Sequence, residues 1–184
     1  MVLDDPALIQ KILDGGYAAF EQLVQKYEKE TIRLVQSIVK DESMVGDVVQ
    51  ETFFQVYQKL KDFKGESSFK TWLYRITVNT SLEEMRKHRR WSWWKRERTE
   101  ELAQEMDPPL SSAEEKLIDF EQSSLIRSLL DQLPEESRLI LHLRYYENLE
   151  TPEMAAILSV PEGTVRSRLF NARKRLEKLL TPHL

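Results

Sequence analysis

Side chains that carry out bond-making chemistry are sparse in this 184-residue chain. Cysteine is absent, and the three histidines, His88, His142 and His183, are too far apart in sequence to form a metal-ligand motif. Asp47 and Glu51 are four residues apart, so a helix would bring both carboxylates to one face. Metal-assisted hydrolysis usually needs more than two ligands, so these carboxylates make a metal-dependent nuclease the least favoured function for this chain. The sequence predicts no catalytic residue, no cofactor and no metal, and hence a protein that is not an enzyme.

Aromatic and basic side chains are mixed in one stretch, FKTWLYRITVN at residues 69–79, which leads into a basic segment at residues 86–90. This mixture suits single-stranded DNA, because bases stack on aromatic rings while Arg and Lys hold the phosphates. Phe69, Trp72 and Ile76 also have the spacing of a helix face, which is more typical of a core. We therefore assign Trp72 mainly to packing.

A helix-turn-helix motif is predicted between Thr151 and Leu180. Thr151 can cap a first helix that ends near Ser159, and Pro161 suits the start of a second helix. The second helix would bury one side (Val165, Leu169, Ala172, Leu176, Leu179) and leave a basic side free (Arg166, Ser167, Phe170, Arg173, Lys174). Such a face suits the major groove of DNA, although a basic amphipathic helix that merely closes a helical domain would look the same.

Charge is unevenly distributed along the chain, whose net charge is −4. Residues 70–98 carry nine basic and three acidic side chains, and residues 161–184 carry six and two. Residues 99–131, between these blocks, carry two basic and nine acidic side chains. Two basic blocks joined by an acidic connector indicate two contacts with a polyanion, although two solvated faces would give the same pattern.

The elements that position these residues are all predicted to be helices, because no segment shows the period-two alternation of a strand. Helices are expected from Asp5 to Gly15, and over residues 20–39, 44–60 (with Ser43 as a possible cap), 68–88, 112–133 and 134–149, before the helix-turn-helix. An acidic, aperiodic segment with Pro108 and Pro109 separates them into two groups. The expected fold is all-α, with small helical domains at residues 1–94 and 112–184 joined by a flexible acidic linker at residues 95–111.

The chain is expected to stay in the cytoplasm. Its first ten residues, MVLDDPALIQ, do not resemble a secretory signal. No run of eighteen uncharged apolar residues occurs, so no direct membrane insertion is expected.

The helix expected over residues 44–60 contains a third distinctive stretch, GDVVQETFFQVY. Asp47, Gln50, Glu51 and Gln55 leave a polar, partly acidic face on this helix. The face could dock a basic partner, but periodicity alone favours a solvated outer surface.

Taken in order, five motifs resemble an extracytoplasmic-function (group IV) RNA polymerase sigma factor of the sigma-70 family. They are DVVQETF, FKTWLYRITVN with its basic end, the acidic linker, LPEESRLILHLRYYENL, and PEMAAILSVPEGTVRSRLFNARKRL. The resemblance covers nearly the whole chain and implies a sigma-two domain followed by a sigma-four domain. It implies an alternative sigma factor that binds polymerase core, directs it to specific promoters and helps to open the duplex.

The resemblance also assigns roles to residues by their match to the family motifs. Docking on the β′ clamp helices of the polymerase is implied for Asp47, Gln50, Glu51 and Phe53. Recognition and melting of the minus-ten promoter element is implied for Lys64, Ser67, Phe69, Trp72, Arg75, Asn79, Arg86, Arg89 and Arg90. Recognition of the minus-thirty-five element is implied for Arg166, Ser167, Arg168, Phe170, Asn171, Arg173 and Lys174.

The implied partners are RNA polymerase core, including its β flap, promoter DNA and a regulator, commonly an anti-sigma factor, with no small-molecule substrate. The sequence departs from the family pattern at Asn171, where many members have Arg or His, and at Pro152. Trp91, Trp93 and Trp94 have no family role and could anchor the linker to the first domain. The alternative function is a polymerase-independent repressor or activator that uses the helix-turn-helix alone, with the first domain as a sensor or dimerisation module. It predicts tight duplex binding without polymerase.

Overall fold

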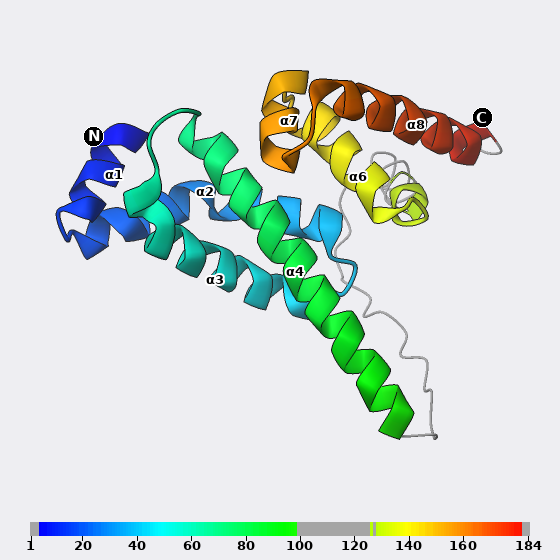
Figure 1. Ribbon diagram of the computed structural model, residues 1–184, viewed down its shortest axis with the longest axis horizontal. Coiled ribbons are helices and arrows are strands. Elements are labelled where there is room, and N and C mark those ends of the chain that lie inside the picture. The colour runs from blue at the N-terminus through cyan, green and yellow to red at the C-terminus, as the bar shows by residue number, and fades with distance from the viewer. Residues whose placement is uncertain (1–3, 99–125, 127, 182–184) are drawn as a thin grey trace, which may run out of the picture.

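The computed structural model describes residues 4–98, 126 and 128–181. Within these residues the regular elements are helices, as predicted, and none is a strand (Figure 1). They are α1 (Asp5–Leu13), α2 (Tyr17–Ile38), α3 (Glu42–Lys59), the 3-10 helix η1 (Leu60–Asp62), α4 (Phe69–Arg98), α6 (Glu135–Leu141), the π-helix η2 (His142–Tyr146), α7 (Thr151–Leu158) and α8 (Glu162–Leu180). Most of the predicted linker, and most of the helix expected over residues 112–133, lie outside the described residues, although residues 128–131 are helical.

Short polar side chains fix where the first helices begin. Asp4 accepts a hydrogen bond from the Ala7 amide at 3.1 Å and caps α1. The expected cap of α3 at Ser43 is wrong, because the Asp41 carboxylate accepts from the Ser43 amide at 3.0 Å and the helix begins at Glu42. Between α1 and α2, Gly16 has no room for a side chain, since a Cβ atom there would lie 2.8 Å from the Lys11 carbonyl oxygen.

Helices α1 to α4 form the first unit around a common apolar core. Leu23, Leu34 and Val35 of α2 are fully buried, and Leu73 and Ile76 of α4 belong to the same core. Trp72 is 9% exposed, and its ring centroid lies 5.2 Å from that of Phe63 and 5.8 Å from that of Phe69. The assignment of Trp72 mainly to packing is confirmed.

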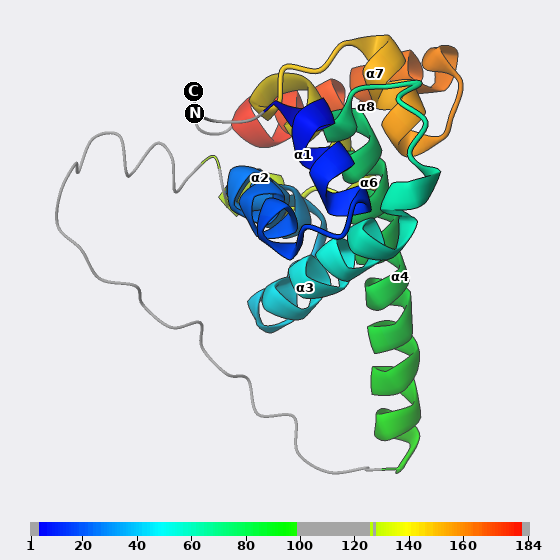
Figure 2. The ribbon, with the colours of Figure 1, turned by 90° about the vertical axis from the view of Figure 1, so that its left-hand side faces the viewer.

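Helix α4 is longer than predicted, since it continues past residue 94, where the first domain was expected to end, to Arg98. Thirty residues of α-helix span about 45 Å. Its C-terminal half extends away from the other helices, as the two ribbon views show (Figures 1 and 2).

The second unit consists of α6, η2, α7 and α8. The single helix expected over residues 134–149 is interrupted, because the chain widens into the π-helix η2 after Leu141. Asn148, at φ 53°, then ends this segment in the left-handed conformation that asparagine tolerates. The expected cap at Thr151 is wrong as well, because Glu150 and Glu153 form a reciprocal capping box and Thr151 is already helical.

The two units pack against each other. Helix α6 lies against α2, α7 lies against α4, and the apolar core runs through both units without a break. Polar contacts between described residues also cross this interface, and two of them are made by a buried arginine, Arg138, which reaches the end of α2. The described chain is therefore a closed form in which the second unit covers part of the first.

Candidate nucleic-acid interface

A cleft of about 410 Å³ lies at the N-terminal end of α4. The loop from η1 to α4 forms one side, and Gly65, at φ 72°, allows the loop to turn where other residues would be strained. Ser68 then caps α4 by accepting from the Thr71 amide at 3.1 Å. The cleft is lined by Asp62, Phe63, Lys64, Glu66, Ser67, Thr71, Trp72, Arg75 and, from the second unit, Ala156.

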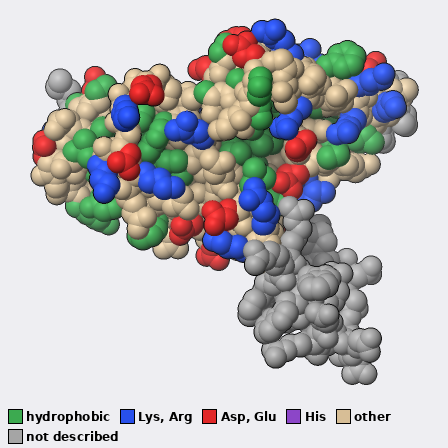
Figure 3. Space-filling view, viewed as in Figure 1, with side chains coloured by type: hydrophobic (Ala, Val, Ile, Leu, Met, Phe, Trp, Pro, Cys, Tyr) green, Lys and Arg blue, Asp and Glu red, His purple; other side chains and the backbone are tan. Residues whose placement is uncertain are grey.

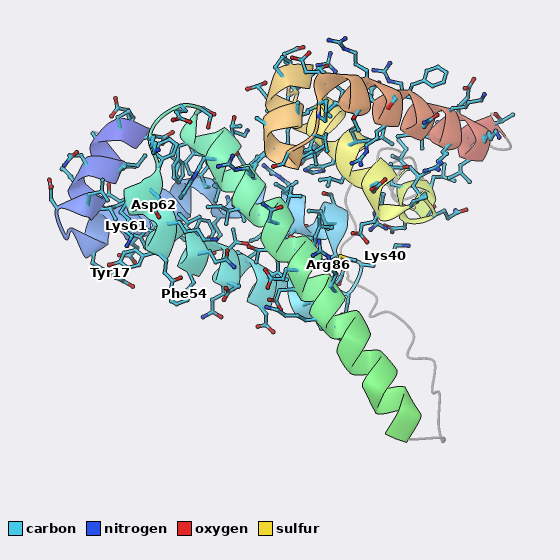
Figure 4. The ribbon with its side chains drawn as sticks, viewed as in Figure 1. Tyr17, Lys40, Phe54, Lys61, Asp62 and Arg86 are labelled. Atoms are coloured by element: carbon cyan, nitrogen blue, oxygen red, sulfur yellow. The ribbon has the colours of Figure 1, made fainter. Side chains whose placement is uncertain are left out.

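The residues predicted to contact the minus-ten element differ in position: some line the cleft, one is buried beneath it, and others are exposed along α4. Lys64, Ser67, Trp72 and Arg75 line the cleft, whereas Phe69 is buried beneath it against Tyr27. Arg75, Asn79 and Arg86 are exposed on α4, and their spacing of four and seven residues puts them on one face of that helix. Figure 4 shows Arg86 on the projecting half of α4. Arg89 and Arg90 lie further along this helix, outside the side chains that the structure describes.

The predicted upstream residues lie on α8, and the packing of that helix follows the predicted division. Val165, Leu169 and Ala172 are buried against α6 and α7, while Arg166, Ser167, Phe170, Asn171, Arg173 and Lys174 are exposed. Arg168 is half-buried at the edge of the packed side. Figure 3 shows Lys and Arg side chains gathered over α8, with Asp and Glu spread more widely over the molecule.

Contacts within the second unit hold several of these cations in place. Arg166 pairs with Glu162 at 2.8 Å, one turn earlier on α8. The Arg173 guanidinium lies 5.6 Å from the centroid of the Tyr145 ring, which supports it by a cation–π contact. Arg168 lies 3.8 Å from Glu136 of α6, so its charge is partly engaged within the protein.

The polar face predicted on α3 is present, with one difference. Asp47 and Gln50 are exposed, and Glu51 is half-buried and accepts from Gln55 at 3.1 Å. Phe53, however, is 7% exposed and belongs to the core.

Two aromatic side chains that the sequence prediction missed lie on this α3 face. Phe54 is 55% exposed and Tyr57 is 51% exposed. Phe54 lies seven residues after Asp47, and Tyr57 lies seven residues after Gln50, which is the helical spacing that could have identified them. Figure 4 shows Phe54 and Tyr17 on the same edge of the molecule, away from the second unit.

Each of the two units matches a known protein family. Residues 23–91 match the family described as Sigma-70 region 2, and residues 123–176 match Sigma-70, region 4. The chain is 32% identical to the RNA polymerase sigma-H factor of Pseudomonas aeruginosa over 188 residues, which covers 98% of this chain and 95% of that protein. It is 35% identical to the ECF RNA polymerase sigma-E factor of Escherichia coli K12, with 98% and 96% covered.

The chain belongs to the extracytoplasmic-function sigma factors. Its fold agrees with this assignment, since it matches CnrH, solved in complex with the cytosolic domain of CnrY, with a TM-score of 0.68. That match has 26% identity and covers 97% of each chain. The role of this sigma factor is therefore in transcription initiation with RNA polymerase.

Within the described residues, no three His, Asp or Glu side chains are grouped so that they could hold a metal ion. None of the described helices is both long enough and apolar enough to cross a membrane.

Proposed function

We propose that this sigma factor binds RNA polymerase core through α3, opens the minus-ten element with α4 and its cleft, and reads the minus-thirty-five element with α8. The observation that carries the proposal is the presence of two separate cationic surfaces, on α4 and α8, in a chain that also presents a polar and aromatic face on α3. The polymerase supplies the chemistry, so the sigma factor is not itself an enzyme. It acts in the cytoplasm, where the polymerase is.

The cleft at the start of α4 suits a base taken out of the duplex. Its volume of about 410 Å³ falls within the range of pockets that hold small organic ligands. Lys64 and Arg75 provide cations for phosphates, and Ser67 and Thr71 provide hydroxyls for the edge of a base. The rings of Phe63 and Trp72 line this site, and Phe69 is buried beneath it, so these rings position the groups that touch DNA.

For the upstream element, the exposed face of α8 has the composition of a major-groove reader. Arg166 and Arg173 can contact guanine edges or phosphates, and the small Ser167 permits close approach. Asn171 is exposed on the same helix and can contact adenine.

For the polymerase, we assign docking to Asp47, Gln50 and Glu51 together with Phe54 and Tyr57. The exposed rings replace Phe53 in this role, because Phe53 is held in the core. Aromatic side chains beside a few polar groups are typical of the centre of a protein interface.

An anti-sigma factor is the proposed regulator. It is supported by the similar fold of CnrH, whose solved structure includes the cytosolic domain of CnrY.

Transcription from a promoter library with purified polymerase core, with and without this chain, tests the proposal. New initiation sites that depend on the chain are expected, together with weak duplex binding by the chain alone. Unchanged initiation sites would contradict the proposal. Tight, sequence-specific duplex binding without polymerase would instead support a conventional repressor or activator.

A further inference from the structure

One cluster of charged side chains joins the two units at the start of α4. Glu147, which follows η2, accepts a hydrogen bond from the Tyr74 hydroxyl at 2.5 Å and pairs with the Lys70 ammonium at 3.0 Å. Both of these α4 groups also lie 3.2 Å from the Glu30 carboxylate of α2. A single lysine therefore lies between two carboxylates, one from each unit.

The cluster is shielded from water on the side of the second unit. Tyr74 is 0% exposed, and the Glu147 side chain is 4% exposed. Burial acts to raise the pKa of Glu147, but the nearby His142 ring, whose Nε2 lies 3.6 Å away, and the closer Tyr74 hydroxyl and Lys70 ammonium outweigh burial and lower that pKa to about 2. Glu147 is thus held as a carboxylate by its partners across the interface.

Three further side chains, Arg138, Lys40 and Arg33, make contacts across the same interface. Arg138 of α6 donates to the carbonyl oxygens of Ser37 and Ile38, and Lys40 donates to the Asp131 carbonyl oxygen at 2.8 Å. The Arg33 guanidinium lies 5.3 Å from the centroid of the Tyr146 ring. The second unit is therefore held against α2 along its C-terminal half as well as against α4.

Closure affects the cleft directly. Ala156 of α7 is one of the residues that line it, and α7 packs along the N-terminal half of α4 (Figures 1 and 2). A base that enters the cleft must bring its sugar and phosphates with it, and α7 occupies part of the approach.

We propose that the free chain is self-inhibited: Glu147 acts as a latch that holds the second unit over the cleft, and the latch must open before a promoter strand can enter. The occlusion of DNA rests on the proposed function of the cleft, whereas the closed state itself does not. No regulator is needed for this closure, since all its contacts come from one chain.

Substitution of Glu147 tests the latch without removing the ion pair of the first unit. Lys70 and Tyr74 keep Glu30 as a partner when Glu147 is neutralised, so the first unit retains its own ion pair. Glu147→Gln therefore weakens the contact between the units and leaves each core intact. Glu150→Gln is the matched control, because Glu150 is in the same segment, is largely exposed and pairs with Arg144 of its own unit. Both variants remove one negative charge.

Closure is measured in the full chain by the distance between two spin labels. Because the chain has no cysteine, Gln22→Cys on α2 and Lys178→Cys on α8 give two unique, exposed labelling sites. One narrow distance distribution is expected for the parent chain and for Glu150→Gln, and a broad, longer one for Glu147→Gln. A broad distribution in the parent chain would overturn the closed state. A narrow one in Glu147→Gln would overturn the assignment of the latch.

Occlusion is measured with a fluorescent pool of random single-stranded dodecamers. Binding is expected to tighten about tenfold in Glu147→Gln, because the apparent affinity is proportional to the fraction of open chains and loss of a charged hydrogen bond raises that fraction about tenfold. Glu150→Gln is expected to bind like the parent chain, which excludes a simple charge effect. Equal affinity in an opened Glu147→Gln would overturn occlusion. If the distances behave as expected but polymerase initiation sites do not change with the chain, the closed state stands and the proposed function fails.

Discussion

The Arg138 guanidinium donates to the Ile38 carbonyl oxygen at 3.0 Å, although the two residues are 100 positions apart in the chain. A second bond, at 3.2 Å, reaches the Ser37 carbonyl oxygen. The last carbonyls of a helix lack N–H donors within the helix, so the second unit supplies a cap for the C-terminus of α2. Arg138 is 5% exposed, and this burial lowers the pKa of its guanidinium.

Replacement of Arg138 by methionine tests how much this cap contributes. Arg138→Met removes two charged hydrogen bonds but also relieves a buried charge, so we expect a loss of about 2 kcal/mol in the free energy of unfolding. Arg138→Lys should recover part of it, since an ammonium lacks the planar fork that reaches two carbonyls. Urea denaturation measures the effect, with the exposed Arg86→Met as control. Equal stability of Arg138→Met and the parent chain would contradict the cap.

The low pKa of Glu147 predicts that its contribution to stability depends on pH. The folded pKa of about 2 lies below the ordinary 4.5, so the stabilisation is complete above about pH 4.5 and is lost as the pH falls toward 2. Lys70 and Tyr74 of α4, Glu30 of α2 and His142 of η2 face this carboxylate. The melting temperatures of the parent chain and Glu147→Gln should therefore differ at pH 6 and approach each other as the pH falls from about 4.5 toward 2. A difference that stays constant over this range would contradict the prediction, and Glu150→Gln supplies the baseline.

Helical periodicity was enough to predict the architecture and the DNA-facing side of α8. In that helix the apolar residues recur every three or four positions, so Val165, Leu169 and Ala172 could only pack on one side. On α3 the same rule puts Phe53 on the apolar side of the helix, where it is buried with Val49 and Val56. The docking role of Phe53 came from the family resemblance, and its neighbour Phe54, 100° further around the helix, is the exposed ring.

Contacts between the units were beyond prediction from the sequence for a different reason. Glu147 and Arg138 have charges that local patterns assign to solvent, and their partners lie in helices 73 to 101 residues away. The π-helix that brings Glu147 toward α4 also has no local signature, because one extra residue in a turn does not disturb the apolar pattern around it.

Phe53 and Phe54 provide a matched pair that separates stability from polymerase binding. Phe53→Ala should cost about 3–5 kcal/mol of stability, because it empties a core position. Phe54→Ala should change stability by less than about 0.5 kcal/mol and weaken binding to polymerase core at least about tenfold, as expected for an exposed aromatic anchor. Thermal unfolding and a core-binding titration measure the two effects. Normal core binding by Phe54→Ala would remove Phe54 from the docking surface.

Arg166 tests whether α8 reads bases or only holds phosphates. Its guanidinium is exposed and pairs with Glu162, which orients it along α8 without burying it. If Arg166 contacts a guanine edge, Arg166→Ala should cost about 1–3 kcal/mol and relax the preference at one upstream position. A phosphate contact would instead weaken all promoters alike and reduce the salt dependence of binding. Initiation from a library randomised in the upstream element, with Lys174→Ala as the control on the same face, distinguishes these outcomes. A uniform loss in Arg166→Ala would show that base recognition depends on another residue of α8.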